Sequence, residues 1–356
     1  MKIGILTFHR ACNYGAVLQC YALQEVLKSI GHDVSVIDYA DYHTSEVYKV
    51  ISFYVIRNEI LCPKSFLRYL IKIPFRIKSK RIFEDFVSHY LNITQRCNCN
   101  TIPQDFDIYI IGSDQLWSLS CLGGRENPVY MGDFKHSPFS KIIGYAISTT
   151  PKSLETIGTL KLERYSNNFS SLSFREESNV NILSQLIGVN AHIDIDPTLL
   201  SNNKTWKALI NDNWGKRKYV FTYQARGSKG DLMRRKAKYL AKKEGWEYLD
   251  MSASIFSVAD FISAIKYAQC IITSSFHATV FSLIFKKPFW AIMLNDGHDA
   301  RYIDLLHKIG ADEAIKDLNF PIEQPKRLDY TMIESRLRPI RENSLDYLQK
   351  NASINV

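Results

Sequence analysis

The amino-acid sequence predicts a two-domain α/β protein in which each domain is built on a parallel β-sheet. The first forty residues read as a strand, a helix and a second strand. The apolar runs that follow are separated by stretches long enough for crossover helices. A second pattern of the same kind begins after a polar stretch at residues 201–204. With 356 residues, 46% of them hydrophobic and 23% charged, the chain has the composition of a globular protein with about two domains.

The first domain opens with an apolar strand at residues 2–8, and a loop that contains Asn13 follows it. A helix then extends to Ile30 and stops at Gly31, and residues 34–39 form the second strand. Later strands are expected at residues 108–111, 142–146, 171–174 and 192–195. One Rossmann-like layer therefore occupies roughly residues 1–200, and we assign the N-terminal domain to residues 1–205.

The second domain is assigned to residues 217–325, with the boundary near residues 201–217. Its strands are expected at residues 219–223, 246–249, 270–273 and 288–293. Residues 330–350 read as a C-terminal helix that could pack back on the N-terminal domain. The fold class is therefore α/β with two Rossmann-like domains.

Charge and cysteine usage limit the partners and the compartment. The net charge of +9 and the isoelectric point near 9.0 favour acidic partners, such as phosphorylated metabolites or an anionic membrane. Nucleic acid is disfavoured because the chain has no recognisable recognition module. The seven cysteines are scattered and odd in number, which is typical of a reduced cytoplasmic protein. Cys97 and Cys99 lack the second pair of a zinc site, so we predict no metal.

Two observations favour a cytoplasmic location. The apolar run at the amino terminus is too short for a signal peptide. No stretch approaches the roughly 20 uninterrupted apolar residues that a membrane-spanning helix needs.

The segment 270–284 delivers a histidine from a strand to the start of a helix. Hydroxyl residues at 273–275 can cap that helix, and the first-turn amides of a helix bind phosphate or carboxylate. His277 would then lie beside a bound anion. From these residues alone, the favoured interpretation is a buried histidine whose ring nitrogens have hydrogen-bond partners within the core.

Two loops of the first domain carry polar groups directly after strands. Asn13 and Tyr14 follow the first strand, where open α/β sheets place their ligands, and a purely structural turn fits them equally well. After the strand at 108–111, Asp114 and Gln115 could bind sugar hydroxyls, and Trp117 could offer an apolar face to a pyranose ring. Residues 112–117 fit equally well as the start of a capped helix with a tryptophan in the core, in which case they would bind no sugar. NAD binding is disfavoured because the chain has no G-x-G-x-x-G fingerprint.

Several short motifs, taken together and in order, resemble the polysaccharide pyruvyl transferase family. The similarity extends from about residue 3 to residue 310. It is carried by residues 4–7, 13–19, 112–117, 175–178, 196–200, 274–279 and 301–306, with Asn295.

The resemblance implies two Rossmann-like domains that face a cleft, as in the GT-B glycosyltransferases. Phosphoenolpyruvate would be the donor and co-substrate, with no cofactor, and a glycan hydroxyl pair would be the acceptor. The product would be a pyruvate ketal made in the synthesis of a bacterial surface polysaccharide such as a capsule or exopolysaccharide. The N-terminal domain would hold the acceptor and the C-terminal domain the donor.

The resemblance also assigns roles to residues of this chain. His277 would be catalytic. Arg175 and Arg301 would bind the donor. Independently of the resemblance, the helix start places Ser275 and Phe276 beside the donor, and the two loops of the first domain offer Asn13, Tyr14, Asp114, Gln115 and Trp117 to the acceptor. Some relatives carry an arginine at the position of Ser275, so this chain must contact the donor's anionic groups in another way.

Two other functions remain open. The same architecture serves nucleotide-sugar glycosyltransferases, which would bind a nucleotide diphosphate. A non-catalytic protein that binds an anionic glycan would also suit the positive charge.

Basic residues recur at every fourth position amid apolar ones between residues 64 and 80. They are Lys64, Arg68, Lys72, Arg76 and Lys80. If the segment is helical, this basic stripe could lie on an anionic membrane at the inner face of the cell membrane and meet a lipid-linked oligosaccharide. Pro74 interrupts the pattern, and a solvated helix face is the favoured interpretation.

Overall fold

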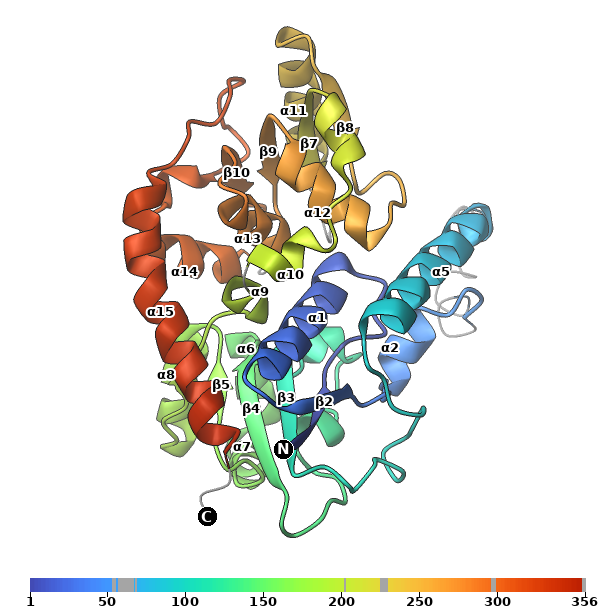
Figure 1. Ribbon diagram of the computed structural model, residues 1–356, viewed down its shortest axis with the longest axis vertical. Helices are drawn as coiled ribbons and strands as arrows, with labels where there is room; N and C mark the ends of the chain where they lie inside the picture. Colours follow the sequence, from blue (N-terminus) through green and yellow to red (C-terminus); the bar gives the residue numbers. More distant parts are fainter. Residues whose placement is uncertain are drawn as a thin grey trace. The chain divides into compact units, whose positions relative to one another are not determined.

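The computed structural model describes residues 1–52, 56, 67, 69–201, 203–224, 230–295 and 299–353. The chain divides into two compact units (Figure 1). Unit 1 comprises Met1–Ser201 with Glu342–Val356, and unit 2 comprises Asn202–Arg341. Each unit contains one sheet whose strands pair in parallel, so the predicted fold class is confirmed.

The sheet of unit 1 has the strand order β2-β1-β3-β4-β5-β6. Every residue of β3 is buried, and β1 and β4 are buried from their second residue on, as is usual for a parallel sheet whose two faces are covered. The strands are β1 (Lys2–Leu6), β2 (Asp33–Val36), β3 (Ile108–Asp114), β4 (Lys141–Ile147), β5 (Ser173–Phe174) and β6 (His192–Ile193).

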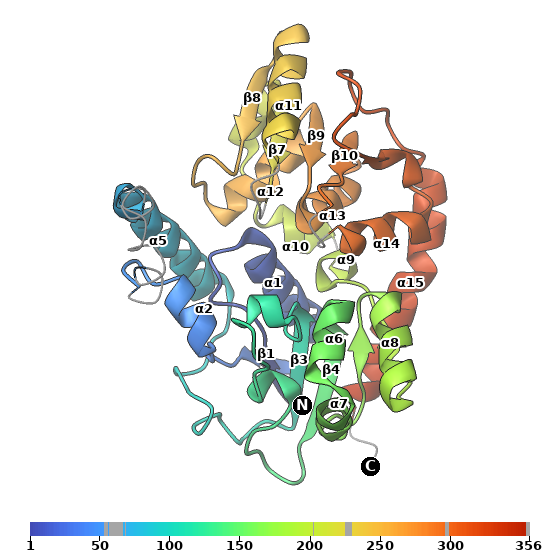
Figure 2. The same ribbon diagram turned by 180° about the vertical axis from the view of Figure 1, so that it is seen from behind.

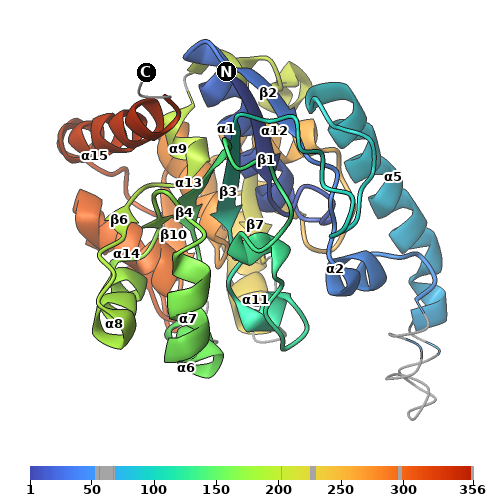
Figure 3. The ribbon, with the colours of Figure 1, turned by 90° about the horizontal axis from the view of Figure 1, so that it is seen from below.

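Helix α1 (Tyr14–Ser29) packs against β2 and β3 and against the short helix α9 (Pro197–Leu200). The helices α6 (Pro151–Ile157), α7 (Thr159–Ser166) and α8 (Glu177–Ile187) pack on one another (Figure 2). Figure 3 shows β3 and β4 with α9 on one side and with α6 and α7 on the other. Side chains of α6, α7 and α8, including Leu154, Leu162 and Leu183, join the strand residues in one hydrophobic core.

Two further helices of unit 1 lie in the described part of the segment between β2 and β3. Helix α2 (Tyr42–Val47) follows β2, and helix α5 (Ile73–Tyr90) precedes β3. Pro74 lies in the first turn of α5, where a proline is tolerated, so it does not interrupt the helix. Of the basic stripe, Lys64 and Arg68 lie outside the described residues.

The sheet of unit 2 has the strand order β11-β10-β9-β7-β8. Helix α11 (Asp231–Lys243) packs on β7, β8 and β9, while α13 (Phe276–Ile284) packs on β9 and β10 and on the helices α12 (Val258–Tyr267) and α14 (Ala300–Ile309). The strands are β7 (Tyr219–Tyr223), β8 (Glu247–Asp250), β9 (Cys270–Thr273), β10 (Phe289–Ile292) and β11 (Ile315–Lys316). The strand β11 was not predicted from the sequence. Helix α10 (Asn203–Lys207) opens the unit.

The last helix, α15 (Tyr330–Asn351), belongs to both units. Its final turns are bonded to the sheet of unit 1: the Tyr347 hydroxyl donates to the Gly144 carbonyl over 2.9 Å, and Ser344 accepts from the Ile195 amide over 3.1 Å. Among the described residues, none of the helices is both long and apolar enough to cross a membrane.

Candidate active site

The strand order of each unit reverses direction at one point, and ligands of open α/β sheets bind beyond the carboxyl ends of the strands at such a switch point. In unit 2 the switch point lies between β7 and β9, because β8 flanks β7 on one side and β10 flanks β9 on the other. His277 belongs to the first turn of α13, which begins three residues after β9 ends at Thr273. The sequence of unit 2 thus delivers His277 to the position where this fold binds ligands.

Ser275 ends the connection between β9 and α13. It adopts an extended conformation and its hydroxyl oxygen accepts a hydrogen bond from the Ala278 amide over 3.4 Å, so it is the helix N-cap. Its own amide donates to the Thr273 hydroxyl over 3.1 Å. The hydroxyl hydrogen of Ser275 remains a donor for a ligand.

Three predicted site residues surround this cap. The rings of Phe276 and His277 meet edge to face with 5.0 Å between their centroids. The guanidinium carbon of Arg301, in the first turn of α14, lies 5.9 Å from the centroid of the Phe276 ring. Unit 2 therefore brings together the predicted residues Ser275, Phe276, His277 and Arg301, at one helix amino terminus.

In unit 1 the switch point lies between β1 and β3. Thr7, directly after β1, is joined to Ser113, near the end of β3, by a hydrogen bond of 2.8 Å from the Thr7 hydroxyl to the Ser113 carbonyl. Gln19, which points back from α1, donates to the Thr7 hydroxyl over 2.9 Å. The two loops that the sequence predicts for the acceptor therefore start from one bonded cluster.

The end of β3 has a backbone that most residues cannot adopt. Gly112 has a φ of +134°, and a Cβ atom added there would lie 2.0 Å from the Tyr145 carbonyl oxygen. Asp114 is not a glycine but has a φ of 88°. Its carboxylate accepts from the Gln115 amide over 2.8 Å. Strained backbone of this kind is found mainly at functional sites, where the surrounding structure holds it in place.

Arg175 is one of the groups that hold this loop. Its Nη2 atom donates to the Ser113 hydroxyl over 2.6 Å and forms an ion pair of 2.8 Å with Asp196. Both charged side chains are almost completely buried, at 4% and 0% exposure. The Ser113 hydroxyl in turn donates to the Ala146 carbonyl over 2.7 Å. Three motifs that carry the family resemblance thus meet in one buried network, and donor binding by Arg175 stays a prediction.

The other predicted acceptor residues have local partners in unit 1. Asn13 caps α1, because its side chain accepts from the Gly15 amide over 2.9 Å and from the Ala16 amide over 3.3 Å. The buried ring of Tyr14 packs on Phe83 of α5, with 5.2 Å between centroids. Gln115 is buried and accepts a hydrogen bond from the Cys121 thiol. Their roles in acceptor binding stay predictions.

Trp117 requires a correction. Its side chain is completely buried, and its ring contacts Phe169 and Phe174 within the hydrophobic core of unit 1. The indole nitrogen donates to the Tyr130 carbonyl over 2.9 Å, which satisfies its one polar atom inside the core. The indole therefore has no exposed face on which a pyranose ring could lie, and the core interpretation of this residue holds.

Sequence reasoning did not single out a charged cluster at the carboxyl ends of β1 and β2. The buried carboxylate of Asp38 accepts from His9 over 3.1 Å and from Arg10 Nε over 2.8 Å. Burial alone would raise the pKa of Asp38, but the hydrogen bonds from His9 and Arg10 hold that pKa well below its usual range. The available signal was that His9 and Arg10 directly follow the predicted strand at residues 2–8, while Asp38 lies near the end of the predicted strand at residues 34–39.

Each unit thus combines a parallel sheet with polar residues at its switch point. The family follows from the sequence: the chain belongs to the polysaccharide pyruvyl transferase family, whose sequence model matches residues 13–296. It is therefore a transferase that acts on polysaccharide. The comparison with curated proteins gave no match.

Solved structures resemble the chain at low sequence identity. A S. aureus MnaA structure with UDP is 9% identical with a TM-score of 0.49, and it aligns with 99% of this chain and 91% of its own. A UDP-GlcNAc 2-epimerase from Methanocaldococcus jannaschii is 10% identical with a TM-score of 0.48, covering 96% and 100% of the two chains. A glycosyltransferase from Streptomyces sp. SF2575 is 11% identical with a TM-score of 0.39, covering 99% and 96%.

Proposed function

We propose that the protein transfers the pyruvyl group of phosphoenolpyruvate to a pair of hydroxyls on a glycan and forms a cyclic pyruvate ketal. The observation that carries this proposal is the position of His277. In a chain of the polysaccharide pyruvyl transferase family, it lies in the first turn of a helix at the switch point of unit 2, next to Phe276 and Arg301. A proton donor and an anion site at one place are what this reaction needs.

The reaction begins with a proton transfer. Protonated His277 donates its proton to the methylene carbon of phosphoenolpyruvate, and positive charge develops on the adjacent carbon. One glycan hydroxyl attacks that carbon, and the phosphate leaves with the electron pair of its bond. The second hydroxyl then closes the ketal ring. Of the two protons released by the hydroxyls, one returns to His277 and the other leaves with the phosphate.

The remaining groups of unit 2 hold the donor. The guanidinium of Arg301 can bind a carboxylate or phosphate through two parallel hydrogen bonds. The N–H groups at the amino terminus of α13 and the Ser275 hydroxyl supply further donors, and the helix dipole favours negative charge there. Orientation of the reactants and stabilisation of the departing phosphate then supply most of the catalysis. The co-substrate carries the reactive bond, so this scheme uses no cofactor.

Unit 1 would bind the glycan through Asn13, Asp114 and the loops that β1 and β3 support. The acceptor could be linked to a lipid, in which case the protein would contact an anionic membrane from the cytoplasm. Exposed apolar side chains at the start of α5, among them Ile71 and Phe75 with Lys72 between them, are suited to such a contact. Surface-polysaccharide synthesis is the process that such an activity would serve.

The test is to incubate the purified protein with phosphoenolpyruvate and a panel of lipid-linked and synthetic galactosides and mannosides. The mass of each acceptor and the released phosphate are followed together. A pyruvylated acceptor with one phosphate released per product supports the proposal. Protection from thermal unfolding by a nucleotide sugar, with none by phosphoenolpyruvate, would contradict it and indicate glycosyl transfer.

A further inference from the structure

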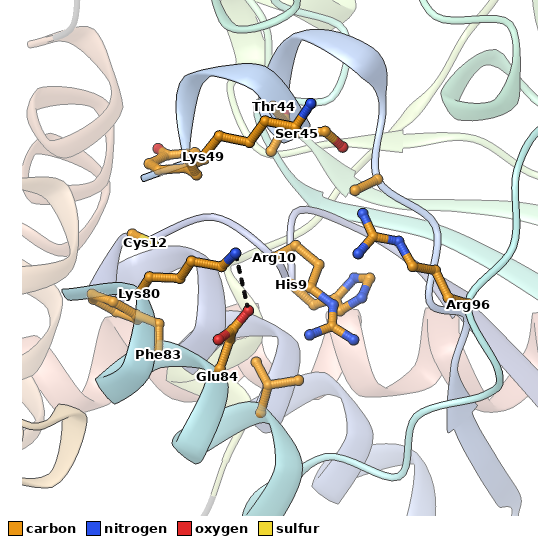
Figure 4. A pocket seen from close by; sticks show the side chains of 13 residues that line it. His9, Arg10, Cys12, Thr44, Ser45, Lys49, Lys80, Phe83, Glu84 and Arg96 are labelled. Atoms are coloured by element: carbon orange, nitrogen blue, oxygen red, sulfur yellow. Dashed lines mark ion pairs between the residues drawn. The ribbon is translucent and has the colours of Figure 1, made fainter. Parts of the chain in front are cut away.

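Unit 1 contains a pocket of about 150 Å³ that lies outside the predicted site residues (Figure 4). It opens beside the carboxyl ends of β1 and β2, between the loop after β1, helix α2 and helix α5. A cavity of about this volume can hold a six-membered ring. The pocket therefore has room for one phosphate group or one sugar ring.

Four cationic side chains line this pocket. Arg10, Lys80 and Arg96 approach it from three segments, namely the loop after β1, helix α5 and the loop after α5 (Figure 4). Lys49 is the fourth cation, and Glu84 is the one carboxylate among the lining residues. Phe83 and Val87 add an apolar wall. Cationic groups combined with an apolar wall suit an anion that is attached to a sugar.

Most of these cations are held in place by a carboxylate. Arg10 forms an ion pair with Asp38, Lys49 with Glu46, and Lys80 with Glu84. In the Arg10 pair, Nε and Nη2 face the carboxylate, so the Nη1 donors remain for a ligand. Each lysine likewise keeps two of its three N–H donors.

Arg96 differs from the other three cations. Among the described residues it has no ion-pair partner, and its side chain is exposed. The backbone around it is nevertheless fixed, because the Cys97 amide donates to the Asp38 carbonyl over 3.0 Å and residues 93 and 97 bridge to residues 36 and 39 in parallel. Its side chain therefore leaves from a fixed stretch of backbone, and it lines the same pocket as Arg10 with five N–H donors (Figure 4).

The thiol of Cys12 also lines the pocket but does not make it a nucleophilic site. Burial raises the pKa of Cys12 to about 11, so the thiol stays protonated at neutral pH. A binding function is the better interpretation of this pocket.

We propose that this pocket binds a phosphate group carried by the glycan acceptor, with Arg96 as the principal ligand and Arg10 and Lys80 as supporting donors. As a statement about the acceptor it rests on the proposed function; as a statement about anion binding it stands without it. The phosphate could belong to a lipid diphosphate or to a nucleotide diphosphate. The exposed Phe75 and Ile77, which precede Lys80 on α5, favour the lipid source.

The direct test is a calorimetric titration of the full-length protein with inorganic pyrophosphate at about 0.15 M salt. We expect the Arg96→Ala variant to bind pyrophosphate at least about tenfold more weakly than the native protein, the loss typical of a charge-assisted hydrogen bond. Lys80→Ala should weaken binding less. The matched control is Arg125→Ala, which removes another exposed guanidinium of unit 1 outside the pocket and should change nothing.

Three results would overturn the proposal: no binding by the native protein, equal binding by the native protein and Arg96→Ala, or equal losses in Arg96→Ala and Arg125→Ala. The last result would mean that pyrophosphate affinity depends only on the overall charge of the protein and not on this pocket. These titrations need no turnover, so they decide about the pocket even if no acceptor is pyruvylated and the proposed function fails.

Turnover then identifies the source of the phosphate. The KM of Arg96→Ala is compared with that of the native protein for a lipid-diphosphate sugar, a nucleotide-diphosphate sugar and the phosphate-free glycoside. A raised KM confined to one of the phosphate-bearing acceptors supports the proposal and names the source. An equal rise for the phosphate-free glycoside would contradict it.

Discussion

The two switch points of this protein use their polar residues differently. In unit 1, the groups around the end of β3 are bonded to each other: Arg175 joins Ser113 to Asp196, and both charges are buried. In unit 2, the polar residues at the end of β9 belong to a single helix start, with His277 in its first turn and Arg301 near the ring of Phe276. The difference separates a motif residue that holds a loop, Arg175, from His277, for which we propose a contact with the donor.

The first consequence concerns His277, where we expect the largest effect. Its replacement by alanine should lower turnover by about 10²- to 10⁴-fold, the usual contribution of a general acid, and should leave the free energy of unfolding within about 1 kcal/mol of the native value. Phosphate release and urea unfolding measure the two quantities. His307→Ala is the control, since His307 pairs with Asp312 at the surface of the same unit. Native turnover in His277→Ala would refute the assignment.

Arg175 should show the opposite pattern. Arg175→Ala removes the guanidinium that pairs with the buried carboxylate of Asp196, so we expect the free energy of unfolding to fall by about 3–5 kcal/mol. Arg164→Ala breaks the exposed pair with Asp133 and should cost about 1 kcal/mol or less. Denaturant unfolding of the two variants measures both losses of stability. Unchanged stability with a raised KM for phosphoenolpyruvate would instead make Arg175 a donor-binding residue.

Asp38 makes the stability of unit 1 depend on pH in the acidic range. Because its pKa in the folded protein lies below the unfolded value of about 3.9, Asp38 contributes stability that is fully present above that pH and is lost as the pH falls through the folded pKa. We therefore expect Asp38→Asn to lower the free energy of unfolding at pH 7, and the gap to the native protein to narrow below about pH 4. A gap that is the same at pH 7 and pH 3 would contradict this account.

The smallest expected effect lies at the start of α5. Within the basic stripe, Arg76 donates to the Val47 carbonyl over 2.7 Å and to the Val50 carbonyl over 3.2 Å, whereas Lys72 is exposed. If the segment contacts a membrane, Lys72→Gln should weaken binding to anionic vesicles by about 1 kcal/mol, or roughly fivefold. Lys152→Gln, on the exposed side of α6, should not. A native protein that does not sediment with such vesicles would exclude the contact.

The sequence predicted the sheets well because buried parallel strands are short apolar runs bounded by polar loops. Residues 219–223 and 270–273 were located to the residue as β7 and β9. β11 was missed because its two residues, Ile315 and Lys316, give no periodic signal. The predicted strand at residues 171–174 is shorter in the structure, because β5 comprises only Ser173–Phe174 and Ser171 forms an isolated bridge with Ile143.

Side-chain roles were harder to predict, because they depend on contacts between residues that are distant in sequence. Trp117 follows a strand in the same way as Asp114 does, and only the packing of Phe169 and Phe174 shows that it faces the core. Nothing in the sequence indicates that Arg175 would meet Ser113, 62 residues earlier. His277 was easier to interpret, since strand, cap and helix start are adjacent in the chain.

The most direct test of the account is turnover per folded molecule in His277→Ala and Arg175→Ala, measured side by side. Phosphate release from phosphoenolpyruvate with a pyruvylated acceptor is divided by the folded fraction from unfolding curves. The account predicts that His277→Ala is folded and inactive, while the folded fraction of Arg175→Ala keeps turnover within about tenfold of the native protein. Equal losses of turnover per folded molecule in both variants would contradict the division between a loop-holding network in unit 1 and a chemical site in unit 2.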